Sequence, residues 1–469
     1  MAPPEAVPST EARPGLVRGL GTWDGALLTI GSIVGTGIFL TTSGMARELP
    51  HPGLILGVWL AGGLLTLAGA LTYGELGAMF PRAGGLYHYL REAYGPLWGF
   101  LFGWAAFLVI MSGGIAALGV AFGEYLGSFL PYFSTKHELA HLGNPDDPLW
   151  TLNGGQVAAC LAILVLTGIN HLGLKEGAGV QSALTVLKIG SIVAFVGLGL
   201  FAPAPGRPDL ASPVAPSGGA LLTAFGVAMI AALWTYDGWY GLTCSAGELR
   251  DPGRSLPRGL ILGTGIVIVL YLLLNLVYIR ALTVPQMAEA DRIGEAAAEV
   301  LFGPTGARLV SLAVLVSTFG CLSSTILYSS RIYLPMAQDG VFFRSLAEVH
   351  PRFRTPVRSL WAQTAWALLL TVSGTYEELF TYVVFVSVMF HAATAAAVIV
   401  LRRTRPDHPR PYRTWGYPAV PALFILACLL LVGNTLAEKP VESLVGLGLL
   451  ALGLPAYLWF RKRTAAQSE

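Results

Sequence analysis

The chain separates its charged residues from a series of long apolar segments. Only 12% of its 469 residues are Asp, Glu, Lys or Arg, about half the share in an ordinary soluble domain. These charges gather in short stretches, and the apolar runs between them reach the roughly 20 residues that a helix needs to cross a bilayer. The surface of this chain is therefore suited to lipid rather than to water.

Twelve membrane-spanning helices are predicted. They lie near 22–44, 53–80, 95–130, 152–172, 177–200, 218–245, 257–283, 299–338, 358–375, 378–401, 417–437 and 442–461. The third and eighth are long enough to tilt or to project beyond the bilayer. The longest segments between spans, 131–151, 339–357 and 402–416, are too short to fold alone. We therefore expect an all-α polytopic membrane protein with its functional site inside the membrane.

The basic residues predict the orientation of these spans. With the N-terminus in the cytoplasm, 20 Lys and Arg residues fall inside, 7 fall outside and 2 lie within spans, which accounts for all 29. One missed or extra helix would invert every later loop and abolish this bias. We expect an inner (plasma) membrane protein with both termini cytoplasmic. Residues 1–20 and 462–469 then form cytoplasmic tails, and 1–20 lacks the apolar core of a cleaved signal peptide.

Several function classes are excluded by what the sequence lacks. A net charge of +2 without a basic stripe argues against nucleic acid binding. The four cysteines lie in apolar segments without a CxxC pair, so no metal site is expected. There is no nucleotide-binding GxxxxGK[ST] and no HExxH, and Ser323 and Ser324 have no matching base motif nearby. We expect neither an enzyme nor a cofactor.

The first span contains a stretch that is prone to unwind. Residues 31–37 include three glycines, and each costs about 1 kcal/mol relative to alanine inside a helix. Non-helical backbone at membrane depth is tolerated only where protein or a water-filled cavity surrounds it. We predict a break here. Close packing of small residues against a neighbouring helix is the alternative.

The sixth span contains a second irregular stretch, at 234–241. It combines Asp237 with two glycines and four large aromatic residues. An acidic residue inside the membrane is costly and usually marks a functional site, although Asp237 could instead cap amides at a helix break. Interruptions at matching positions indicate an inverted-repeat transporter. Exposed amides at such breaks attract a carboxylate and exposed carbonyls attract an ammonium, and an α-amino acid carries both groups.

Seven ordered motifs add a family resemblance. They are IVGTGIF at 33–39, YGEL at 73–76, FPRAGGLY at 80–87 running into LRE at 90–92, YDGW at 236–239, ELRDP at 248–252, Ser330-Arg331 with Asp339-Gly340, and RPYR at 410–413. On these motifs the chain resembles the amino acid–polyamine–organocation superfamily, specifically its L-type amino acid transporter branch. The match covers nearly all of residues 20–420.

The resemblance implies a LeuT-type fold. Inverted five-helix repeats would occupy 21–202 and 218–401, two further helices would lie in 416–461, and helices one and six would be discontinuous. It also implies a substrate site. The amides of Gly35, Thr36 and Gly37 would bind the substrate carboxylate, and carbonyls near Ile33 and at Trp234 and Asp237 would bind its amine. The Trp234 ring would gate the site, with lipid or core packing as its alternative role, and Val109 and Ile110 would line the side-chain pocket.

Lys188 lies about 11 residues into the fifth span, roughly 16 Å deep, which is too far to reach the interface easily. In the family, a lysine here occupies the place where sodium-coupled relatives bind a sodium ion. The resemblance implies that Lys188 braces the unwound first helix. Two roles stay open, a proton carrier for coupling and a permanently charged brace.

The polar residues at membrane depth also bear on the substrate and on partners. Few acidic residues favour neutral L-amino acids, while Asp237 keeps a cationic amino acid or polyamine substrate open; a channel or a non-transporting sensor fits less well. Secondary active transport by alternating access is expected, with proton symport, uniport and exchange all open. Glu75 and Arg331 are interpreted as helix-end anchors or gate partners. His391 is interpreted as an interhelical hydrogen-bonding group, with tuning of the pocket as its alternative role. Animal members of the branch join a heavy chain through a cysteine in the loop after the third helix. Residues 131–151 contain none, so no disulfide-linked heavy chain is expected.

Overall fold

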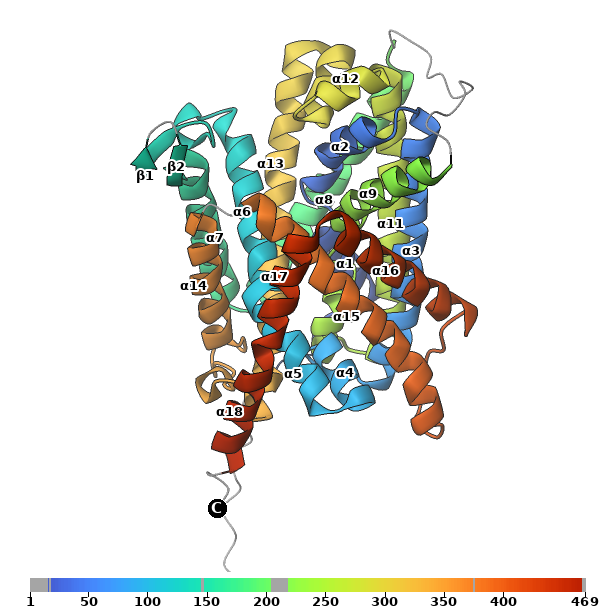
Figure 1. Ribbon diagram of the computed structural model, residues 1–469, viewed down its shortest axis with the longest axis vertical. Coiled ribbons are helices and arrows are strands. Elements are labelled where there is room, and N and C mark those ends of the chain that lie inside the picture. Colours follow the sequence, from blue (N-terminus) through green and yellow to red (C-terminus); the bar gives the residue numbers. More distant parts are fainter. Residues whose placement is uncertain (1–15, 17, 145–146, 204–217, 374–375, 466–469) are drawn as a thin grey trace, which may run out of the picture.

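A computed structural model describes residues 16, 18–144, 147–203, 218–373 and 376–465 as a bundle of mostly lengthwise helices (Figure 1). The α-helices are α1 (Thr22–Ile33), α2 (Thr41–Glu48), α3 (Pro52–Met79), α4 (Leu86–Tyr94), α5 (Pro96–Ala105), α6 (Met111–Gly127), α7 (Gly154–His171), α8 (Leu174–Phe201), α9 (Gly219–Tyr236), α10 (Gly241–Cys244), α11 (Pro252–Ala281), α12 (Val284–Glu289), α13 (Ile293–Gln338), α14 (Val357–Ser373), α15 (Tyr376–Thr404), α16 (Ala419–Glu438), α17 (Pro440–Ala451) and α18 (Gly453–Ala465).

Ten helices in the described part of the chain are long and apolar enough to cross a membrane, and each overlaps one predicted span. The chain is a multi-pass membrane protein. The two remaining predicted spans contain shorter pieces. The segment 22–44 holds α1, of 12 residues, and the start of α2, whereas 358–375 coincides with α14, of 17 residues. Helix length alone therefore gives ten spans, not twelve.

Local irregularities explain the two unusually long predicted spans. The third contains α5 and α6, which are joined without a gap by a π-helix, η2 (Ala106–Ile110). The eighth coincides with most of α13, which runs for 46 residues but contains Gly303 at φ 72°, a conformation that breaks the helical path. π-helical turns inside α-helices occur often at functional sites.

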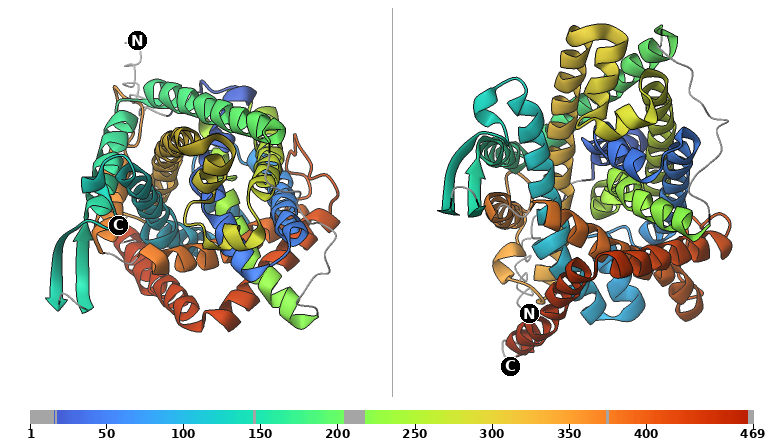
Figure 2. Two further views of the ribbon diagram at one scale, coloured as in Figure 1. Left: turned by 90° about the horizontal axis from the view of Figure 1, so that it is seen from above. Right: turned by 45° about the horizontal axis from the view of Figure 1, so that its top comes forward.

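A β-hairpin corrects the all-α prediction. Strands β1 (Glu138–Asn144) and β2 (Asp147–Asn153) pair antiparallel and project from the side of the bundle (Figure 2). The loop was judged too short to fold by itself, but a neighbouring helix end anchors it. The indole Nε1 of Trp150 donates to the carbonyl of Val372, at the end of α14, at 2.6 Å.

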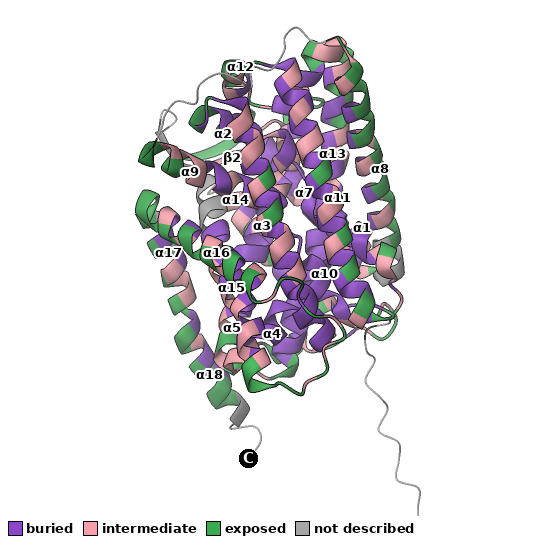
Figure 3. Cartoon of the chain, turned by 90° about the vertical axis from the view of Figure 1, so that its right-hand side faces the viewer, coloured by how far each residue is buried: buried purple, intermediate pink, exposed green. Residues whose placement is uncertain are grey.

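The outer face of the bundle is strongly apolar, as expected for contact with lipid. Figure 3 shows buried residues along the interior and exposed residues on outer helices such as α8 and α18. Leu198 on α8 and Leu430 on α16 are 64% and 65% exposed. Apolar faces of this extent are rare on soluble monomers.

Two acidic side chains are fully buried in ion pairs. The guanidinium of Arg331 binds Glu248 through two hydrogen bonds of 2.8 and 2.9 Å. Glu75 accepts two bonds from Arg402, at 2.7 and 2.9 Å, and one from the amide of Thr414. Each pair joins segments that are far apart in sequence. Arg331 and Glu75 therefore hold neighbouring helices together.

Candidate binding site

The first interruption follows directly from the end of α1. Helical hydrogen bonding stops at Ile33 because Val34 is extended (φ −76°, ψ 99°), and it resumes in a short 3₁₀ helix, η1 (Gly37–Phe39), ahead of α2. Among the described residues, the amides of Gly35, Thr36 and Gly37 donate no hydrogen bond. Three consecutive N–H groups are thereby available to a ligand.

The second interruption lies against the first. Helix α9 ends at Tyr236, Asp237 is extended, Gly238 adopts φ 89°, and α10 begins at Gly241. A Cβ atom placed on Gly238 would lie 2.5 Å from the carbonyl oxygen of Ser32. Glycine is therefore required here both by the backbone angle and by the close approach of the two interrupted segments.

Lys188 supports the broken end of α1. Its side chain is buried, and Nζ donates to the carbonyl oxygens of Gly31 at 3.1 Å and Val34 at 2.7 Å. These carbonyls lie where regular helical bonding ends, so Lys188 supplies donors that the backbone lacks.

Tyr271 of α11 joins the two interruptions to each other. Its hydroxyl lies 3.2 Å from the carbonyl oxygen of Ile33 and 3.3 Å from that of Thr235. A contact from α13 adds to this frame, since the thiol of Cys321 donates to the carbonyl oxygen of Ser32 at 3.1 Å. Side chains from two neighbouring helices thus fix the backbone around both breaks.

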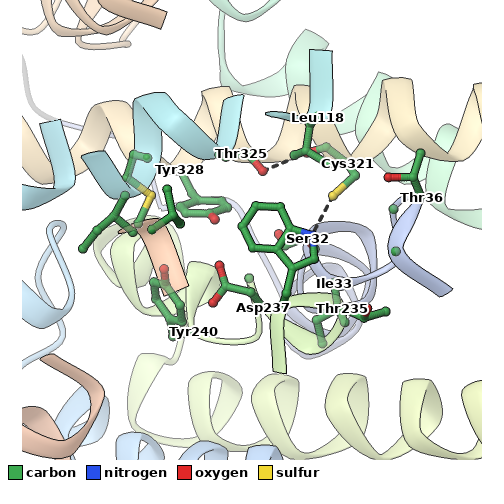
Figure 4. Close-up of a pocket in the computed structure, with 18 residues that line it drawn as sticks. Ser32, Ile33, Thr36, Leu118, Thr235, Asp237, Tyr240, Cys321, Thr325 and Tyr328 are labelled. Atoms are coloured by element: carbon green, nitrogen blue, oxygen red, sulfur yellow. Dashed lines mark hydrogen bonds between the residues drawn. The ribbon is translucent and has the colours of Figure 1, made fainter. Parts of the chain in front are cut away.

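A cavity opens where the two interruptions meet (Figure 4). Seven of the eight residues predicted to bind substrate line it, namely Ile33, Gly35, Thr36, Gly37, Ile110, Trp234 and Asp237. Val109 does not line it and is buried in the core within η2. Lys188 lies outside the lining and reaches the site through the carbonyls of Gly31 and Val34.

Sequence reasoning missed the contribution of α13. Cys321, Thr325 and Tyr328 line the cavity from that helix, and Tyr240 lines it beside Asp237 (Figure 4). The polar run at 323–325 was the available signal for α13, but it was examined only as a possible nucleophile. Tyr240 stood within the aromatic stretch at 234–241 without being assigned a role.

The carboxyl group of Asp237 points toward the space between Tyr240 and Tyr328 (Figure 4). It forms no ion pair with any residue that the structure describes, and it interacts with the backbone amide of Gly238. One wall of the cavity therefore carries an acidic acceptor without an ion-pair partner among the described residues, while another carries the three unengaged amides.

A family model described as "Amino acid permease" matches residues 20–446. The chain belongs to the amino acid permease family. It is therefore an amino acid transporter and not an enzyme, and the resemblance drawn from its motifs is confirmed.

Individual relatives match this permease over almost its full length. The serine/threonine exchanger SteT of Bacillus subtilis is 31% identical over 455 residues, which cover 96% of the permease and 99% of SteT. The human large neutral amino acids transporter small subunit 2 is 29% identical, with 92% and 78% covered. The human cystine/glutamate transporter is 26% identical, with 93% and 84% covered.

A second cavity adjoins the first in this permease. The two share Trp234, Asp237 and Val383, and the second extends to Ser387 and His391 of α15. The hydroxyl of Ser387 is buried and has no hydrogen-bond partner among the residues that the structure describes. The remaining lining is mainly apolar, so this space suits an uncharged side chain that ends in a polar group.

His391 contacts rings rather than forming the interhelical side-chain bond that was expected. Its imidazole lies 4.9 Å from the ring of Tyr240 and 5.5 Å from that of Trp239, centroid to centroid. The hydrogen bond to Tyr73 uses the backbone carbonyl of His391. His391 therefore helps to shape the second cavity through aromatic packing.

Proposed function

We propose that this permease is a secondary active transporter that moves neutral L-amino acids across the cytoplasmic membrane by alternating access. The observation that carries the proposal is the meeting of two interrupted helical segments at one cavity. Unengaged amides lie on one side of it, and backbone carbonyls with the carboxyl of Asp237 lie on the other.

The zwitterionic end of an amino acid matches these groups. Its carboxylate would accept from the amides of Gly35, Thr36 and Gly37, because a charged acceptor gains most from several convergent N–H donors. Its ammonium would donate to carbonyls near Ile33 and at Trp234, and to Asp237. The apolar second cavity would then receive an uncharged side chain.

In this proposal the short helices are halves of two discontinuous spans. Helices α1 and α2 would form the first span, and α9 and α10 the sixth, which with α14 gives twelve. The inverted repeats would be 21–202 and 218–401, followed by 416–461, with both termini cytoplasmic. Alternating access would rock the discontinuous spans against the remaining helices around a fixed site.

Lys188 is the proposed coupling residue. An ammonium donates stronger hydrogen bonds than a neutral amine, so loss of its proton would loosen the grip on Gly31 and Val34. Those carbonyls border the proposed carboxylate-binding amides. Protonation and substrate binding would in this way act on the same backbone segment.

Two transport modes fit this arrangement, proton symport and exchange. The printed name of SteT, a serine/threonine exchanger, supports exchange. We further propose that this permease works without a disulfide-linked heavy chain, because the loop 131–151 contains no cysteine.

The test is uptake of labelled serine, leucine and lysine into proteoliposomes, with and without a pH gradient and with and without internal amino acid. Lys188→Ala should lower neutral amino acid uptake at least about tenfold, since hydrogen bonds to charged groups contribute about 1.5–3 kcal/mol each. Lys439→Ala removes a lysine from a loop and should leave uptake unchanged.

Accumulation driven by the pH gradient would identify symport, and dependence on internal substrate would identify exchange. Absence of uptake for every amino acid would overturn the proposal.

A second candidate function, transport of cationic amino acids or amines, is favoured by the carboxyl of Asp237, which lines the cavity and pairs with no cation among the described residues. Asp237→Asn keeps the shape of the side chain and removes its charge. If the carboxyl binds the α-ammonium, this variant should lose serine, leucine and lysine uptake together. Loss of lysine uptake alone would show that Asp237 selects a cationic side chain, and the neutral assignment would then be wrong.

A further inference from the structure

A third cavity lies between the segment that follows α13 and the end of α18, away from the proposed substrate site. It is lined by Gly340, Phe342, Phe343, Arg344, Ser345, Phe460 and Arg463. These residues stand at the ends of two candidate spans, Ile293–Gln338 and Ser443–Arg463. The cavity therefore lies at the boundary between the membrane and water.

Two arginines of this cavity have no acidic partner within the described residues. Neither Arg344 nor Arg463 forms an ion pair with any residue in the described part of the chain. The nearby carboxylate of Glu348 pairs with Arg358 at 3.0 Å. Arg358 also donates to the carbonyl oxygen of Ser345 at 3.3 Å, so this neighbouring pair is fixed beside the cavity.

Three phenylalanines form the apolar part of the same cavity. The rings of Phe342, Phe343 and Phe460 all contact one another, with centroid distances of 5.1, 5.2 and 5.8 Å. Phe343 is half exposed, as is Trp459, which contacts Phe460 and lies under the guanidinium of Arg463. Exposed aromatic rings at the end of a span are typical of the headgroup level of a bilayer.

We propose that this cavity binds the headgroup of an anionic phospholipid. The guanidinium groups of Arg344 and Arg463 would clamp the phosphate, because the planar guanidinium matches phosphate oxygens in two-point hydrogen bonds. The phenylalanine cluster would contact the glycerol and the first acyl carbons. Basic pockets between spans at a membrane surface bind lipids of this class.

The apolar cluster distinguishes a lipid from free phosphate. Inorganic phosphate satisfies the arginines but leaves the three rings unused, whereas a phospholipid engages both. With the orientation proposed above, the bound lipid belongs to the cytoplasmic leaflet. The binding itself rests on the cavity alone and not on the transport mode.

The experiment measures lipid retained by the purified full-length chain in detergent, by native mass spectrometry, together with the lipid-induced shift in thermal unfolding. The probes are phosphatidylglycerol, phosphatidylcholine and inorganic phosphate. The unsubstituted chain should retain phosphatidylglycerol in preference to phosphatidylcholine. Arg344→Gln with Arg463→Gln should weaken phosphatidylglycerol binding about tenfold or more, since each lost bond to a charged group is worth about that factor.

The matched control is Arg461→Gln with Lys462→Gln. It removes the same charge, and both residues lie on α18 next to Arg463 but outside the cavity lining. This control should keep the lipid preference. Arg344→Lys with Arg463→Lys preserves charge and folding and should bind with intermediate strength, and Phe343→Ala should weaken lipid binding without affecting phosphate binding.

Three results would overturn the proposal. Equal loss in the cavity and control variants would indicate diffuse surface attraction. Inorganic phosphate that displaces phosphatidylglycerol at similar concentrations would indicate a small-anion site. Full lipid retention by the cavity variant would show that the arginines play no part. None of these measurements depends on transport, so they stand apart from a failure of the proposed function.

Discussion

Gly238 shows how one residue sets the geometry of the proposed site. Its φ of 89° is a conformation that other residues rarely adopt, and Ser32 occupies the space where a side chain would begin. The backbone of the two interrupted segments can approach this closely only because position 238 has no Cβ atom. The pairing of unengaged amides with an acidic wall depends on that approach.

We predict that Gly238→Ala lowers the free energy of unfolding by about 1–3 kcal/mol through backbone strain, with further loss from the clash, and that it abolishes amino acid uptake. Gly190→Ala is the matched control, because a Cβ atom at position 190 would meet nothing within 4 Å. Denaturation of the purified protein and proteoliposome uptake measure the two effects. Unchanged uptake in Gly238→Ala would show that the close contact is not needed.

At the scale of elements, the buried ion pair between Arg331 and Glu248 links α13 to the segment that follows α10. Both side chains are almost completely buried, at 1% and 0% exposed. The pair therefore connects one proposed moving segment to a neighbouring helix.

Removing one member of a buried pair leaves an uncompensated charge. Arg331→Met should therefore lower the free energy of unfolding by about 3–5 kcal/mol, and adding Glu248→Gln should restore part of that loss. The exposed pair Arg358–Glu348 is the control, and its disruption should cost only about 0.2–1 kcal/mol. Unfolding in mixed detergent micelles measures both. Additive effects of Arg331→Met and Glu248→Gln would refute the coupling.

At the scale of the whole molecule, the two ends of the helix bundle carry loops of different composition. The loop with β1 and β2 lies toward the end that carries α12, whereas α4 and the end of α18 lie at the opposite end (Figures 1 and 2). The basic loops that predict a cytoplasmic side include those after α13 and α15. A twelve-span path with both termini cytoplasmic follows if α1–α2 and α14 each cross the membrane once.

Cysteine labelling tests that path. Lys136→Cys should react with a membrane-impermeant maleimide in intact cells, and Lys462→Cys should react only after permeabilisation, because twelve crossings place them on opposite sides. Both positions are exposed in the structure. The unsubstituted chain, with its four native cysteines, supplies the background. Labelling of Lys462→Cys in intact cells would refute the twelve-span topology.

The amino-acid sequence alone predicts that the protein lies in lipid and where its helices are prone to break. Long apolar runs indicate which segments face lipid. Glycines at 35, 37 and 238 indicate where a continuous helix is energetically unfavourable. Ordered motifs identified the family, which the comparisons confirm. All of these features depend on local composition, so no knowledge of neighbouring helices was needed.

Which side chains contact the interrupted backbone depends on the tertiary structure and could not be predicted from the sequence. Lys188 reaches carbonyls more than 150 residues away in sequence, and α13 adds Thr325 and Tyr328 to the cavity. Val109 lies outside the lining, whereas Ile110, its neighbour in the π-turn, lies within it. Most buried polar groups have a partner, and which partner that is depends on packing between distant segments.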